Sequence, residues 1–150
     1  MREPTQKLLV AAELLDRALA TYFEGKYYFA ALHLAGAAEE ILGVYVSRLG
    51  EDSSYKALRD GAVRISSFLS GGKESSAREI EAIMNYAKNR TKHLNKSGDD
   101  DVCFDPASET LNLLDLAVSN YYKLMNGFNL PETELVDRFN KEISGRGMTP

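Results

Sequence analysis

The chain has 150 residues, which fits one domain spanning residues 1–150 with a sizeable core. Its net charge of −4 argues against a protein that coats nucleic acid with a broadly basic surface. No apolar run approaches the roughly 18–20 residues of a membrane span, and the run from Leu8 to Ala12 is too short for a signal-peptide core. The single cysteine, Cys103, excludes an intramolecular disulfide and suits a reducing compartment. We therefore expect a cytoplasmic protein without a membrane segment.

Apolar residues at spacings of three and four predict a first helix that starts near Pro4, where a missing N–H costs nothing. Its expected buried stripe is Leu8, Ala12, Leu15, Leu19 and Tyr22. Gly25 ends this helix, and the short connection makes the next helix an antiparallel neighbour.

The second predicted helix covers about residues 26–49 and is apolar on every side over much of its length. Its main stripe is Tyr28, Ala31, Ala35, Ala38, Leu42, Tyr45 and Leu49. No residue from Tyr27 to Ala38 carries a formal charge if His33 is neutral. Such a helix is central in the fold or buried against a partner chain, so we expect a homodimer that buries part of it. Gly36 and Gly43 each cost up to ~1 kcal/mol relative to Ala in a helix interior, which indicates a packing reason for them.

Two further helices are predicted in the middle of the chain. The third has an expected buried stripe of Tyr55, Leu58, Ala62, Ile65 and Leu69. Ser76 and Glu79 have the spacing of a capping box, in which each side chain satisfies the other's free N–H. The fourth helix is therefore predicted from about Ala77 to Asn95. Its expected stripe is Ile80, Met84, Ala87, Thr91 and Leu94, with Ile83 beside it.

The last part of the chain predicts two more helices. Asp105 as N-cap and Pro106 at the first helical position open a fifth helix, for which Gly127 is the expected C′ residue. Its expected stripe is Ala107, Leu111, Leu114, Val118, Tyr121 and Met125. A short helix from about Glu132 to Glu142 is expected to bury Leu135, Val136 and Phe139. The predicted fold class is all-α, an up-and-down helical bundle of about five helices plus a short C-terminal helix.

The segment from Asn85 to Lys96 combines a histidine, amides and several cations within the fourth predicted helix. At ~100° per residue, Asn85, Asn89 and His93 stack on the side opposite the core stripe. Four cations lie in nine residues: Lys88, Arg90, Lys92 and Lys96. A histidine can move protons near neutral pH, and flanking cations can hold a phosphate. A solvated charged face is the alternative explanation.

The run Lys88-Asn89-Arg90-Thr91-Lys92-His93 resembles the signature of HEPN domains (higher eukaryotes and prokaryotes nucleotide-binding). That signature is an arginine, commonly followed by asparagine, with a histidine five positions after the arginine. In the second helix, residues 27–31 and 37–42 are similar to the Y-x-A-A…A-A-E-x-x-L run of bacterial HEPN proteins. The resemblance covers about residues 5–126.

The resemblance implies a helical bundle that dimerises and brings two copies of the motif to one cleft, where active members cut RNA without a metal. It makes His93 the acid/base, Asn89 its polar companion, and Lys88 the residue at the arginine position. Lysine lacks the planar fork with which arginine grips phosphate. We therefore expect a HEPN-like domain that binds RNA or nucleotide without strong catalysis, through Lys88, Arg90, Lys92 and Lys96. Neither a metal nor a cofactor is expected.

Two other functions stay open, a helical dimeric adaptor or antitoxin-type protein-interaction module, and a metal-independent RNase. Outside the central segment, His33 lies in an apolar run and is expected to be a hydrogen-bonded core or interface residue. A di-iron carboxylate bundle would need two Glu-x-x-His pairs, and the sequence has none. Glu39 and Glu40 are expected to face solvent or to pair with a neighbouring cation.

Overall fold

The computed structural model describes residues 3–73, 75–94 and 98–143. Within these ranges every regular element is a helix, which confirms the all-α class, but there are seven helices where six were expected. They are α1 (Lys7–Glu24), α2 (Tyr28–Arg48), α3 (Ser54–Leu69), α4 (Ala77–Met84), α5 (Tyr86–Lys92), α6 (Pro106–Phe128) and α7 (Glu134–Glu142).

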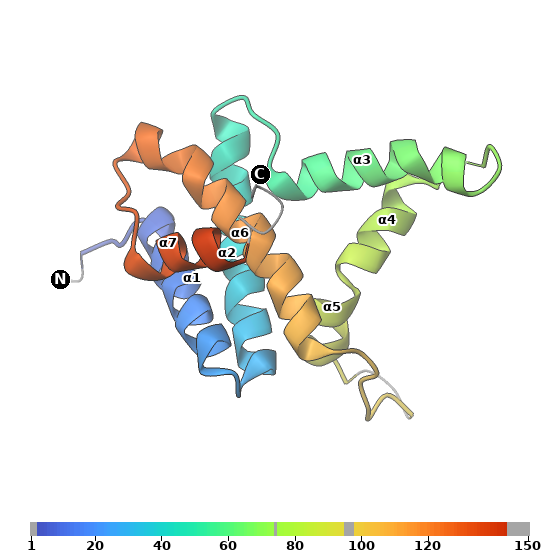
Figure 1. Ribbon diagram of the computed structural model, residues 1–150, viewed down its shortest axis with the longest axis horizontal. Helices are drawn as coiled ribbons and strands as arrows, with labels where there is room; N and C mark the ends of the chain where they lie inside the picture. Colours follow the sequence, from blue (N-terminus) through green and yellow to red (C-terminus); the bar gives the residue numbers. More distant parts are fainter. Residues whose placement is uncertain (1–2, 74, 95–97, 144–150) are drawn as a thin grey trace.

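Helix α2 lies at the centre of the bundle, packed between α1 and α6 (Figure 1). The predicted stripe is confirmed over its central part, where four side chains are fully buried: Ala31, Ala35, Ala38 and Leu42. They pack against buried leucines of α1 (Leu15, Leu19) and α6 (Leu114) in one core. By length and composition α2 would also pass for a membrane-crossing helix. Half of this apolar stretch is buried inside the bundle, as in the core helix of a globular protein.

Helices α2 and α6 run in the same direction. At their starts, Thr110 Oγ1 donates a hydrogen bond to the Tyr28 carbonyl oxygen over 3.0 Å. At their ends, the rings of Tyr45 and Phe128 meet edge to face with centroids 5.7 Å apart. The up-and-down order therefore holds for α1 and α2 only, because α3, α4 and α5 carry the chain back to the starting end before α6 begins (Figure 1).

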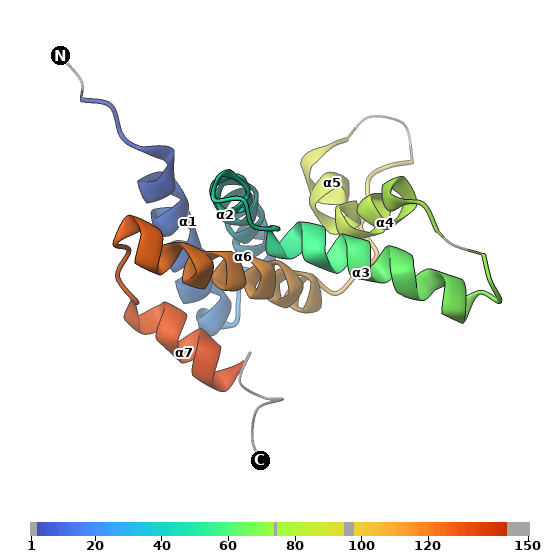
Figure 2. The ribbon, with the colours of Figure 1, turned by 90° about the horizontal axis from the view of Figure 1, so that it is seen from above.

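Helices α3 and α4 form an arm that projects from the bundle (Figures 1 and 2). Ser54, its first residue, is the only buried residue of α3. The predicted burial of Leu58, Ile65 and Leu69 is therefore wrong, because all three are exposed. The helix is amphipathic as expected, but it extends beyond the reach of α6, so most of its apolar face has no partner within the described residues.

The prediction of one helix from Ala77 to Asn95 is also wrong. The capping box of Ser76 and Glu79 is present and starts α4, but the chain turns at Asn85 (φ −95°, ψ −1°). The Asn85 side chain donates to the Tyr55 hydroxyl over 2.9 Å, which ties this turn to α3. The turn lets α4 follow α3 while α5 packs on α2. Of the predicted stripe only Ala87 is buried.

The C-terminal helices largely match their predicted positions. Asp105 caps α6 by accepting a hydrogen bond from the Ala107 amide over 3.2 Å. The helix continues through Gly127, and Asn129 takes the left-handed conformation (φ 52°) that was expected of the glycine. Asparagine tolerates this conformation better than most residues do. In α7, Val136 and Phe139 are buried as predicted.

Candidate functional site

The predicted basic segment does not form one continuous surface. Asn85 and Lys88 line one cavity, whereas Arg90, Lys92 and His93 line another. Because α5 ends at Lys92 and His93 is extended (φ −123°, ψ 136°), the expected stack of Asn85, Asn89 and His93 on one helix face is wrong. Asn89 is exposed and lines neither cavity. Lys96 lies outside the described residues.

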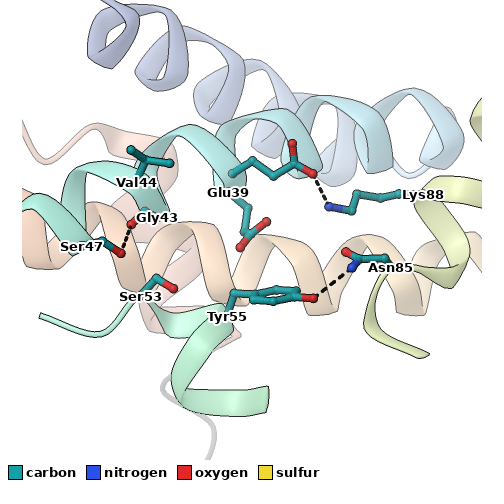
Figure 3. A pocket seen from close by; sticks show the side chains of 9 residues that line it. Glu39, Gly43, Val44, Ser47, Ser53, Tyr55, Asn85 and Lys88 are labelled. Carbon is teal, nitrogen blue, oxygen red and sulfur yellow. Dashed lines mark hydrogen bonds and ion pairs between the residues drawn. The ribbon is translucent and has the colours of Figure 1, made fainter. Parts of the chain in front are cut away.

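Lys88 is a buried, paired cation. Its residue surface is only 4% exposed, and its Nζ donates to Glu40 Oε1 over 2.7 Å (Figure 3). The ion pair confirms the expectation that Glu40 meets a neighbouring cation. With its charge matched and its stem enclosed, Lys88 is not presented to solvent as a phosphate ligand.

The cavity beside Lys88 has a volume of about 440 Å³. Helices α2, α3 and α5 and the turns next to them build it (Figure 3). Its lining residues are Glu39, Glu40, Gly43, Val44, Ser47, Ser53, Tyr55, Asn85 and Lys88. We call this space the Glu39 cavity.

Glu39 is the most unusual group in the cavity. Only 3% of the residue is exposed, and burial raises the pKa of its carboxyl to about 7, an effect that Lys88 opposes and Glu40 reinforces. The expectation that Glu39 faces solvent or pairs with a cation is wrong. The sequence does hold a signal for its burial, because Glu39 lies four residues after Ala35 and three before Leu42, on the core stripe.

Tyr55 forms the wall opposite Glu39. Its hydroxyl oxygen accepts from Asn85 Nδ2, and burial raises the pKa of this hydroxyl, with the Asn85 hydrogen bond acting the other way. Among the described residues, nothing accepts the hydroxyl's own hydrogen. The cavity therefore joins a buried carboxyl, a phenol with a free proton and a paired ammonium.

The second cavity, of about 560 Å³, brings His33 of α2 together with Lys92 and His93. His33 Nε2 lies 2.6 Å from Thr91 Oγ1. The Thr91 hydroxyl also lies within hydrogen-bond distance of the Ala87 and Lys88 carbonyl oxygens of its own helix. Burial, Lys92 and Lys88 lower the pKa of His33. His33 is thus a hydrogen-bonded histidine, as predicted, and its lowered pKa favours the neutral ring.

The charges around the second cavity are mixed. Arg90 forms an ion pair with Asp99, and its Nη2 also donates to the Asp101 carbonyl oxygen over 3.2 Å. Among the predicted cations in the described part of the chain, Lys92 alone has no carboxylate partner. Lys92 and His93 are both exposed. This cavity therefore presents one free cation beside two histidines and an acidic loop.

No three His, Cys, Asp or Glu side chains within the described ranges gather as metal ligands would. The chain matches no protein-family model, and searches of curated proteins and of solved structures likewise find no match. Any function assigned to the two cavities and the arm therefore rests on their own chemistry.

Proposed function

We propose that the protein is a helical association module that forms a homodimer through the arm of α3 and α4. The observation that supports this proposal is the apolar surface of the arm, where large side chains are left exposed. These are Leu58 (53%), Ile65 (55%), Phe68 (87%), Leu69 (82%) and Ile83 (73%). Leu58, Ile65 and Leu69 recur at spacings of seven and four along one face of α3, and an exposed apolar face of this kind is typical of an interaction surface.

A second copy of the chain is the occupant that fits this surface best. Burying a side chain of this size contributes about 1.5–3 kcal/mol, whereas association costs an estimated 4–15 kcal/mol. If the exposed apolar side chains of one arm met a polar partner surface, their contribution would be similar in size to the cost of association. In a symmetric dimer each arm buries the other, so the apolar contribution is counted twice.

The interface expected on α2 is replaced in this proposal. Gly36 and Gly43 permit close approach, but the groups that approach them belong to the same chain, Lys88 and Ser53. Both glycines therefore have a packing reason inside the protomer, and the dimer does not need them.

The test is the mass of the particle in solution. At micromolar concentration we expect light scattering to give about twice the 16.6 kDa of one chain. Replacing Phe68 and Leu69 together by serine should halve that mass without loss of helical circular dichroism. Leu9→Ser is the control, because Leu9 is also an exposed apolar residue (54%) but lies on α1. A monomeric wild type, or a double variant that remains dimeric, would contradict the proposal.

RNA or nucleotide binding, as HEPN-like proteins show, is the second candidate function. The gathering of Lys92, His93 and His33 around one cavity favours it. Of the three expected cations within the described residues, Lys92 is the one free to contact phosphate, since Lys88 and Arg90 have carboxylate partners. Lys96 lies outside those residues. Dimerisation that brings two copies of His93 into one cleft would strengthen this candidate.

Fluorescence anisotropy with labelled single-stranded RNA tests it. Affinity should fall with salt with a log–log slope of roughly −0.7 per phosphate contact. Lys92→Ala should flatten the slope. Lys141→Ala should leave it unchanged, because Lys141 is an exposed cation on α7 that pairs with Asp137. An absence of binding at low salt, or equal slopes for the wild type and Lys92→Ala, would remove this candidate.

A further inference from the structure

The Glu39 side chain is largely buried, and its carboxyl lines the cavity without a protein partner. Among the described residues, none donates a hydrogen bond to it and none forms an ion pair with it. The positive charge of Lys88 acts to lower the pKa of Glu39, but the Lys88 ammonium forms its ion pair with Glu40. Figure 3 shows the Glu39 side chain pointing from α2 into the cavity, toward Tyr55. A carboxyl that opens into a cavity and has no protein partner is placed to meet something that enters that cavity.

A second unpaired group lies beside the same space. Asn120 of α6 is fully buried. Its Oδ1 accepts from the Ser54 amide over 2.8 Å, but its Nδ2 has no hydrogen-bond partner among the described residues. A Cβ atom added to Gly43, which lines the cavity, would lie 3.7 Å from that Nδ2. The Asn120 Nδ2 group, a donor that has no acceptor, therefore lies close to the cavity in which the Glu39 carboxyl has no donor.

The charges of the cavity decide which kind of ligand suits it. With Glu39 ionised, two carboxylates face one ammonium, so an anion would add a like charge. A neutral molecule would leave the Glu39 charge unmatched. The volume of about 440 Å³ lies within the ~300–1,000 Å³ of small-molecule sites. From this geometry we propose that the Glu39 cavity binds a small organic cation, whose amine or guanidinium head pairs with the Glu39 carboxylate.

The lining chemistry gives the bound cation further contacts. An N–H of the head donates to a Glu39 oxygen, and the ring of Tyr55 offers a face to the positive charge. The stem of the ligand lies against Val44 at the side of the cavity. Binding needs the ionised carboxyl, and the charged or titratable groups facing it are Glu40, Lys88 and Tyr55. Because the Glu39 pKa is about 7, affinity should rise as pH rises from 6 to 8, with release of a proton.

Isothermal titration calorimetry of the full chain with agmatine and with butylamine tests the proposal, and butanol serves as the neutral analogue. We expect saturable binding of at least one cation at pH 8 and none of butanol. Ionisation of one group with a pKa of about 7 changes affinity about tenfold between pH 6 and 8. Two buffers with different ionisation enthalpies should report the released proton.

Two variants show whether a loss of binding comes from the Glu39 cavity itself or from a loss of folded structure. Glu39→Gln keeps the shape of the side chain and should weaken binding at least tenfold, with the pH dependence lost. Val44→Trp should block the cavity while it leaves Glu39 intact, since Val44 is half exposed. Leu49→Trp is its control, because Leu49 is similarly exposed but lines no part of this cavity. The proposal is overturned if neither cation binds at pH 8, if butanol binds equally well, or if folded Glu39→Gln binds like the wild type.

Discussion

The side chain of Lys88 crosses the backbone of Gly36 so closely that a Cβ atom at position 36 would lie 2.6 Å from Lys88 Cδ. The lysine cannot simply swing away, because its Nζ is held by Glu40 over 2.7 Å. This contact joins α5 to the central helix. It also explains why a glycine is present in the middle of a well-formed helix, where an alanine would be preferred.

Gly36→Ala should lower the free energy of unfolding by about 1 kcal/mol. The gain in helix propensity is up to ~1 kcal/mol, but overpacking costs ~1–3 kcal/mol. The loss should vanish in a Lys88→Ala background, where the added methyl group has room. Urea denaturation of the four proteins in this cycle measures both effects. Gly61→Ala on α3 is the control and should be stabilising, because only the end of Arg64 comes near that position. If Gly36→Ala and Gly61→Ala stabilise the protein equally, the contact of Lys88 with position 36 does not contribute to the free energy of unfolding.

The Glu39 carboxyl should make the protein less stable as pH rises. Its pKa in the folded chain is about 7, against an ordinary value of 4.5, so between these values the folded state holds a proton that the unfolded chain releases. The full effect is on the order of 3 kcal/mol. Glu39→Gln should therefore gain stability relative to the wild type between pH 4.5 and 7, with the difference constant above that range.

Urea denaturation at several pH values from 4.5 to 8 checks this prediction. Glu13→Gln, on the exposed side of α1, is the matched control and should show a difference from wild type that does not change in this way. A Glu39→Gln difference that is flat with pH would mean that the carboxyl is better solvated than its burial indicates.

Asn120 should hold the start of α3 in place. It is fully buried, and it accepts the Ser54 amide hydrogen bond across 66 residues of sequence. Asn120→Leu leaves that buried donor unsatisfied, at a cost of about 1–3 kcal/mol. Faster hydrogen exchange at the first turn of α3 should accompany the loss. Asn112→Leu, at an exposed position of the same helix, should change neither quantity. Unaltered exchange at Ser54 in Asn120→Leu would show that α3 is anchored by other contacts.

The protein should not cleave single-stranded RNA at enzymatic rates in EDTA. Lys88, at the arginine position of the HEPN-like motif, is buried and paired with Glu40, so its charge is not available to a phosphate. Lys88→Arg should stay inactive for the same reason, because the new guanidinium would still face Glu40. Cleavage that leaves 2′,3′-cyclic phosphate ends and is lost in His93→Ala would show that the motif is an active one.

Several features of the fold could be predicted from the sequence because they depend on local rules. The uncharged run of α2 indicated a central helix, and α2 is enclosed by α1 and α6. Short-range chemistry also located the helix starts at Ser76 and Asp105, since a capping side chain bonds to a backbone amide only two or three residues away. These features need no knowledge of distant contacts.

The apolar periodicity of α3 showed which face of the helix is apolar, but not what covers it. Leu58 and Ile65 have the same spacing as the buried leucines of α1, yet they are exposed on the arm. The turn at Asn85 was equally hidden, because it is stabilised by a hydroxyl that lies 30 residues earlier. Both features depend on where α3 leaves the bundle.

Glu39 shows most clearly which features the sequence determines and which depend on the tertiary structure. Its spacing from Ala35 and Leu42 determined that it lies on the buried stripe of α2. Only the tertiary structure decided that this stripe is covered there by Tyr55 of α3 and Lys88 of α5, with space left between them. The raised pKa and the unpaired carboxyl follow from that packing, because desolvation depends on which atoms surround a group and not on its neighbours in the chain.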